Sequence, residues 1–170
     1  MIELNRKVLV MAVALMAVVM IALPISAVSA TKPMPVSGTF TIFPGVISEN
    51  NAGNSDNSIW TFEDLPVIFD GGIIGTGSYD GRWVVHNYDD PLALWVNSKG
   101  HYEIEATVDG KSGTLYIEAG SNSGHPTTLK PAKWRIIGGT GELANLHGQG
   151  TFIGETIFLY VYTGQVHFDP

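Results

Sequence analysis

The chain has 170 residues, the length of one domain, and its 9 basic and 16 acidic residues give a formal net charge of −7. Such a surface is a poor partner for nucleic acid, because phosphate binding requires clustered lysine and arginine. The sequence has no cysteine, so a packed core rather than disulfides must stabilise the fold.

The first thirty residues predict an export signal rather than a folded element. Two basic residues precede an apolar run over residues 8–23, and after a proline the segment ends in small residues at Ala30. This order is typical of a secretory signal peptide, residues 1–30. The alternative is a retained membrane anchor, since the apolar stretch continued past the proline approaches the roughly 20 residues of a bilayer span. In both cases we expect the domain, residues 31–170, to be secreted or at the cell surface, with a membrane contact only if the segment is retained.

The first half of this domain predicts strands separated by polar loops. Residues 36–43 form the first strand, and residues 44–58, rich in glycine and asparagine, form a loop. A second strand begins at residues 59–64. Residues 71–88 hold a Tyr-Asp-Gly-Arg sequence at 79–82 between apolar flanks, which predicts a hairpin that turns there.

The segment 92–119 predicts three strands. They are joined by turns at 98–100 and at Asp109 and Gly110, because an Asp-Gly pair between alternating segments is a strong hairpin signal. Alternation of polar and apolar residues places one face of a strand in the core and the other in water. The predicted buried face carries Tyr102, Ile104, Ala106 and Val108, and the predicted wet face carries His101, Glu103, Glu105 and Thr107.

The C-terminal segments are more apolar. Residues 132–139 place Trp134 and Ile136 on one face. The final segment is apolar on both faces, with Ile157, Leu159 and Val161 on one and Phe158, Tyr160 and Tyr162 on the other. A strand of this kind is covered on both sides. A second subunit bound along residues 156–163, giving a homo-oligomer, is the simplest cover, and a packed loop is the alternative.

These elements predict an all-β domain. Eight or nine short strands, hairpin connections and no long helix leave a closed antiparallel barrel or a sandwich. Closure removes the exposed sheet edges that promote aggregation, which favours the barrel for an exported chain. We therefore predict a single domain over residues 31–170 that forms a closed antiparallel β-barrel of about eight strands.

The stretch IIGGTGELANLHGQGTF, residues 136–152, predicts a corner of this barrel. Residues 142–146 are long enough for one helical turn, whose leucines can pack into the barrel end. Glycines on either side permit close backbone approach and sharp bending. This account requires no ligand, and it assigns a structural role to Gly138, Gly139, Gly141, Gly148 and Gly150.

The same stretch, followed by IFLYVYTGQV, resembles the C-terminal half of the allene oxide cyclase-like barrels. This superfamily includes the plant cyclase, the dirigent proteins and a prokaryotic family of unknown function. The shared pattern is Gly-Gly-Thr-Gly, a leucine and a small residue, then Gly-Gln. Together with DGKSGTLYIEAG, it is most similar to the prokaryotic family, and the likeness covers residues 109–164.

The resemblance implies an antiparallel barrel of about eight strands that is often oligomeric. The plant cyclase acts as a trimer on a fatty-acid epoxide, and dirigent proteins steer the coupling of phenolic intermediates. The residues that match are structural, so an enzyme of this kind, which would be isomerase- or cyclase-like, has no recognisable catalytic motif here. A Gly-x-Ser-x-Gly nucleophile motif is also missing from the sequence.

Two functions follow from these observations. Inward-facing residues could line a lumen that holds a small apolar molecule, with the protein acting as a binding protein or a cyclase- or dirigent-like guide; the same residues could instead fill a solid core. The alternative is a non-catalytic structural or interaction module that oligomerises through its C-terminal strand. The five histidines show no metal-ligand spacing, so we predict neither metal nor cofactor. The residues assigned to the candidate ligand cavity are Tyr102, Ile104, Trp134 and Ile136.

Overall fold

The computed structural model describes residues 32–45, 47–51, 57–87, 90, 93, 95–123, 131–156 and 158–170. Residues 1–30, interpreted as a signal peptide or membrane anchor, lie outside the described residues. Within the described ranges, no helix has the length and apolar character to cross a bilayer.

Nine antiparallel strands and one short 3-10 turn make up the described fold. In chain order they are β1 (Met34–Ile42), β2 (Ile47–Asn51), β3 (Asn57–Gly71), β4 (Ile74–His86), β5 (Trp95–Val108), β6 (Lys111–Ser123), β7 (Ala132–Gly139), the 3-10 turn η2 (Gly141–Leu143), β8 (Leu146–Gly154) and β9 (Leu159–Phe168). Each strand from β3 to β9 pairs with its neighbour in sequence.

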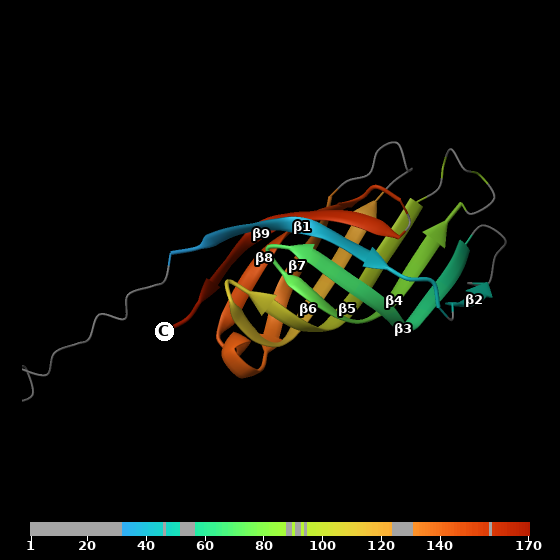
Figure 1. Cartoon of the computed structure of the whole chain (residues 1–170). Helices are drawn as coiled ribbons and strands as arrows, with labels where there is room; N and C mark the ends of the chain where they lie inside the picture. Colours follow the sequence, from blue (N-terminus) through green and yellow to red (C-terminus); the bar gives the residue numbers. More distant parts are fainter. Residues whose placement is uncertain are drawn as a thin grey trace, which may run out of the picture.

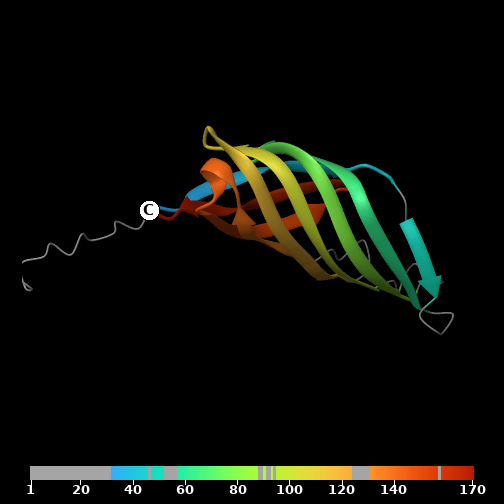
Figure 2. The same cartoon turned by 90° about the horizontal axis from the view of Figure 1, so that it is seen from below.

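The sheet closes through its first strand. β1 pairs with β9 along one side and with β3 along the other, which joins the two ends of the sheet (Figure 1). β2 pairs only with β3 and lies outside the closed ring. The prediction of an all-β closed antiparallel barrel of eight strands is therefore confirmed. Figure 2 shows η2 at the end of the barrel where β9 ends and β2 at the opposite end.

The alternation seen in the sequence sets the orientation of the strands. In β5, Tyr102 and Ile104 are buried inside the barrel, whereas Glu103 and Glu105 are exposed on the outside. The hairpin between β5 and β6 turns at Asp109 and Gly110, which have φ of 51° and 75°. Both values are those of a type I′ turn, which matches the twist of the strands it joins.

Two predicted turns are wrong. Residues 79–82 lie inside β4 and residues 98–100 lie inside β5, so each of these strands is long and continuous. The reason is that Gly81 and Gly100, directly opposite each other, make room for the ring of Tyr79. An ideal Cβ would lie 2.1 Å from the Tyr79 hydroxyl at position 81 and 2.3 Å from Tyr79 Cε2 at position 100.

The polar loop predicted at residues 44–58 is also wrong in part. It contains β2, and β3 already begins at Asn57. The backbone of β2 is paired with β3 through five residues in register. Strand formation here follows from hydrogen bonding to a neighbouring strand, which polar residues can provide as well as apolar ones.

Candidate functional site

A row of small residues crosses the inner wall of the barrel from β4 to β9. In register, the row runs through Gly81, Gly100, Ala119, Trp134, Gly150 and Gly164. Trp134 is the one large residue in this row, and its ring covers Gly150 and Gly164. Its indole nitrogen donates a 3.3 Å hydrogen bond to the carbonyl of Thr151, which satisfies the polar end of the ring. The glycines therefore serve the packing of large rings across the lumen.

Two residues of the glycine corner, Gly139 and Gly141, occupy positions that disfavour a side chain. Gly141 begins η2 with φ of 59°, in the left-handed region that favours glycine. A Cβ at Gly139 would lie 2.4 Å from the carbonyl oxygen of Leu143, so the two segments approach too closely for a side chain. Leu143 and Leu146 are fully buried and close this end of the barrel.

All four residues assigned to the candidate ligand cavity point into the barrel. Tyr102, Ile104, Trp134 and Ile136 have relative exposures of 4%, 0%, 6% and 8%. A cavity of about 10 Å³ adjoins Tyr102 and Trp134. This is about the space that one water molecule requires, and its lining is apolar. The structure therefore places the four residues inside but leaves them packed against their neighbours.

Aromatic rings fill most of the lumen beside this cavity. Phe40 stacks on Phe69 with 4.8 Å between ring centroids and on Tyr160 with 4.7 Å. The rings of Tyr102 and Phe152 both pack edge-on against Phe40, with centroids 5.6 and 5.3 Å from its centroid. An eight-stranded barrel is just wide enough for side chains of this kind. A ligand could occupy the lumen only by displacing these rings.

The buried tyrosines of this core are poor acids. Burial raises the pKa of Tyr79 to about 12, although a 3.0 Å hydrogen bond from the indole of Trp83 opposes the shift. Burial also raises the pKa of Tyr102 well above its usual value. Both phenols therefore stay protonated at neutral pH, and neither can act there as a base. Among the described residues, no three His, Cys, Asp or Glu side chains are arranged to hold a metal ion.

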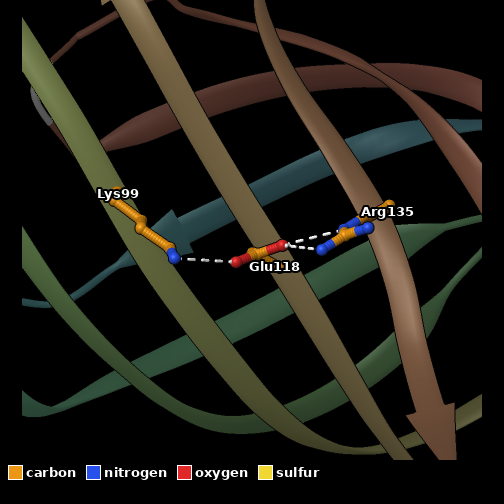
Figure 3. A network of polar contacts seen from close by, with 3 residues as sticks. All are labelled: Lys99, Glu118 and Arg135. Atoms are coloured by element: carbon orange, nitrogen blue, oxygen red, sulfur yellow. Dashed lines mark hydrogen bonds and ion pairs between the residues drawn. The ribbon is translucent and has the colours of Figure 1, made fainter.

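The outer wall carries a three-residue ion-pair network. Glu118 on β6 contacts Lys99 on β5 at 3.1 Å and accepts a 2.8 Å hydrogen bond from Nε of Arg135 on β7 (Figure 3). The hydrogen bond from Arg135 has the largest effect on the pKa of Glu118, followed by the one from Lys99, and both lower it. The network joins three adjacent strands on the solvent side, where Lys99 and Arg135 remain mostly exposed.

Charge is distributed unevenly around the outside of the barrel. The outward positions of β4 to β7 carry Asp80, Arg82, Lys99, Glu103, Glu105, Glu118, Lys133 and Arg135. A contrasting region, here called the uncharged face, lies next to the outward-facing His147 and His167 at the ends of β8 and β9. It consists of further outward residues of β8, β9 and β1, namely Gln149, Thr151, Ile153, Leu159, Val161, Thr163, Gln165, Ser37, Thr39 and Thr41. Ile153, Leu159 and Val161 are exposed by 43%, 37% and 38%.

The doubly apolar character of the last strand is confirmed for its described residues. Tyr160 and Tyr162 point into the core, whereas Leu159 and Val161 point outward on the uncharged face. Ile157, predicted to share a face with Leu159 and Val161, lies outside the described residues. The sequence alone indicated that this strand has two apolar faces, but not that β8 and β1 lie beside it. β1 in particular comes from the other end of the domain.

A histidine pair was missed by the sequence analysis. His147 on β8 lies opposite His167 on β9, and their rings stack with 5.5 Å between centroids. Asp169 approaches both, with carboxylate oxygens 3.1 Å from Nε2 of His147 and 3.4 Å from Nε2 of His167. Only the register of the two strands brings these residues together, so their spacing in the sequence gave no signal.

Comparison with known proteins supports the fold. The chain resembles the crystal structure of a protein of unknown function from the DUF3224 family of Shewanella oneidensis MR-1, with a TM-score of 0.59. The two share 14% sequence identity over 82% of this chain and 99% of the other. No protein-family model matches the sequence, and no curated protein matches it. At this identity the similarity shows a shared barrel fold.

Proposed function

We propose that this barrel is a non-catalytic interaction module that self-associates through the uncharged face. The observation that carries the proposal is the cluster of exposed aliphatic side chains on adjacent strands. Ile153 lies directly opposite Val161, which in turn lies opposite Thr39 on β1. Leu159 extends the cluster along β9. A contiguous apolar area of this kind on a folded surface is typical of a protein contact site.

The distribution of charge favours a second copy of this chain as the partner. The protein has a net charge of −7, so most pairs of surfaces would bring like charges together. The uncharged face avoids this repulsion, because none of its ten residues is ionisable. The centre of a protein interface is depleted in charged residues, as this face is. Two copies can therefore bury their aliphatic residues against each other without desolvating a charge.

The packed lumen gives less support to the other function. The hypothesis of a small apolar ligand, in a binding protein or a cyclase- or dirigent-like guide, requires several hundred cubic ångströms in a typical site. The cavity beside Tyr102 and Trp134 has about 10 Å³. We further propose that this protein is related to the allene oxide cyclase-like barrels in fold and motif. The eight-stranded barrel and the glycine corner support this relation.

Light scattering on purified protein tests the self-association. We expect the wild type to have a mass above that of one chain, and Val161→Glu to be monomeric, because it places a charge at the centre of the uncharged face. The matched control is Ile137→Glu, since Ile137 is 51% exposed but lies on β7 among charged residues. The control should keep the wild-type mass. A monomeric wild type at its highest soluble concentration would refute the proposal.

We also propose that the domain is exported and that residues 1–30 are removed. The support is the charged, apolar and small-residue order of that segment. Intact mass spectrometry of the protein recovered from an exporting host should show a chain that begins after Ala30. A full-length product in the membrane fraction would instead establish the anchor.

A further inference from the structure

The outside of the barrel has a hollowed band that the proposed self-association does not explain. Two open hollows of about 530 and 1000 Å³ lie against the outer wall and meet at Ser98 and Lys99. The first extends across β3, β4 and β5, and the second across β5 to β9. Gly120 points outward in the second hollow and leaves its floor without a side chain between β5 and β7. The band is therefore a shallow, open depression that crosses the strands, here called the groove.

Four of the nine basic residues of the chain line this groove, together with the carboxylates of Glu63, Asp80 and Glu118. Arg82, Lys99 and Lys133 occupy one row across the strands, in which Lys99 lies directly opposite Arg82 and Gly120 separates it from Lys133. Arg135 lies two residues along β7. Like charges directly opposite each other destabilise a sheet. An anion bound along this row would reduce the repulsion between its cations.

Two of these cations have no ion-pair partner within the described part of the chain. Glu118 neutralises Lys99 and Arg135. Arg82 and Lys133 make no salt bridge to any described residue, and both side chains are exposed. The two unpaired cations therefore flank the Lys99–Glu118–Arg135 network, which Figure 3 shows as a link between β5, β6 and β7.

The remaining lining is rich in neutral hydrogen-bonding groups. Beyond the cations and Glu118, the polar lining of the second hollow consists of Ser98, Ser121, Gln149, Thr151 and Gln165. Hydroxyl and amide groups can both donate and accept, which suits a ligand that carries many hydroxyls. A peptide that adds to a sheet as a strand needs a free strand edge, and β5 to β8 are each paired on both sides.

We propose that this groove binds an anionic oligosaccharide, whose carboxylates pair with Arg82 and Lys133 and whose hydroxyls meet the neutral residues. Guanidinium and ammonium groups form charge-assisted hydrogen bonds with carboxylates, which are stronger than neutral ones. The bound carboxylates also relieve the repulsion between Arg82 and Lys99. The two cations lie on β4 and β7, outside the uncharged face, whereas Gln149, Thr151 and Gln165 belong to both surfaces. Substitution of Arg82 and Lys133 therefore tests the groove without altering the uncharged face.

Isothermal titration calorimetry with oligogalacturonate at low salt tests the site. We expect the wild type to bind, with an affinity that falls as salt is added. The double variant Arg82→Gln/Lys133→Gln should bind on the order of tenfold more weakly, since it removes two exposed ion pairs with the ligand. It removes no salt bridge between described residues. The control Lys111→Gln, a cation that lies 3.6 Å from the Phe168 ring centroid near the barrel end, should keep the wild-type affinity.

Four results would overturn the proposal. The wild type could fail to bind oligogalacturonate. A neutral glucan of equal length could bind as tightly, which would show that the cations are not used. Poly-glutamate could bind as tightly, or Lys111→Gln could lose as much affinity as the double variant, which would show general attraction of polyanions rather than recognition of a sugar acid.

Discussion

Trp134 lies in the space that a side chain at Gly164 would occupy. An ideal Cβ at position 164 would be 2.4 Å from Cζ2 of the indole and also 2.4 Å from the carbonyl oxygen of Gln149. The two residues come from β7 and β9, with Gly150 of β8 between them in register. The ring thus reaches over two strands, and the glycines of both are part of one packing unit.

Gly164→Ala is therefore expected to destabilise the barrel. The added methyl group must displace a buried ring and a backbone carbonyl, and overpacking of this kind typically costs about 1–3 kcal/mol. Gly138→Ala is the matched control, because its Cβ would meet only Tyr116 Cδ2 at 3.7 Å, an ordinary contact. Urea denaturation of the three proteins measures the difference. Equal free energies of unfolding for the two variants would contradict this account of the glycine row.

The same reasoning predicts an energetic coupling between Tyr79 and Gly100. The three atoms nearest to a Cβ at position 100 all belong to the Tyr79 side chain. Gly100→Ala should therefore destabilise the wild type but cost less in a Tyr79→Leu background, where the far end of the ring is missing. We expect a coupling of about 1 kcal/mol or more in a double-mutant cycle of unfolding free energies. Additive effects would show that the clash is relieved elsewhere.

These glycines explain why part of the fold could be predicted and part could not. The alternation in β5 and the Asp-Gly turn are local signals, and both predictions are confirmed. Gly81 and Gly100 were interpreted as turn residues because glycine in a strand and glycine in a turn look alike in a sequence. Their actual role depends on the register of β4 and β5, which places one opposite the other beneath the Tyr79 ring.

The hydroxyl of Tyr162 connects the last strand to the turn between β3 and β4. It accepts a 2.8 Å hydrogen bond from the buried backbone N–H of Ile73. Tyr162→Phe leaves this donor without a partner, which should cost about 1–3 kcal/mol. Tyr116→Phe is the control, since the Tyr116 hydroxyl makes no hydrogen bond within the described residues, and it should change stability by less than about 0.5 kcal/mol. Thermal denaturation compares the two, and a similar loss in both would reject the role given to Tyr162.

Alkaline pH should unfold the protein through its buried phenols. Burial raises the pKa of Tyr79 from 10.0 to about 12 and that of Tyr102 well above 10.0. The folded state therefore holds these protons more tightly than the unfolded state, so their contribution to stability is complete below pH 10 and declines as the pH rises from 10 towards 12. Absorbance at the tyrosinate band should rise together with the loss of far-UV circular dichroism. Ionisation of both residues in a still-folded barrel would contradict their burial.

The candidate interaction surfaces were harder to predict than the core. The sequence indicated that the last strand has two apolar faces, and this led to the residues of β9 on the uncharged face. The groove was not predicted, because Arg82, Lys99 and Lys133 are far apart in the sequence and become neighbours only through pairing of β4 to β7. Surface sites in a barrel depend on register across strands, whereas core positions follow from alternation along one strand.

Closure by β1 also sets the order in which the ring can be completed. β1, which begins at Met34, can be paired on both sides only after β9, which ends at Phe168, has formed. Contacts between such distant segments slow folding, because chain entropy is lost before they form. Until then the free sides of β3 and β9 remain available to other chains, and this interval is the stage at which the protein is most prone to aggregate.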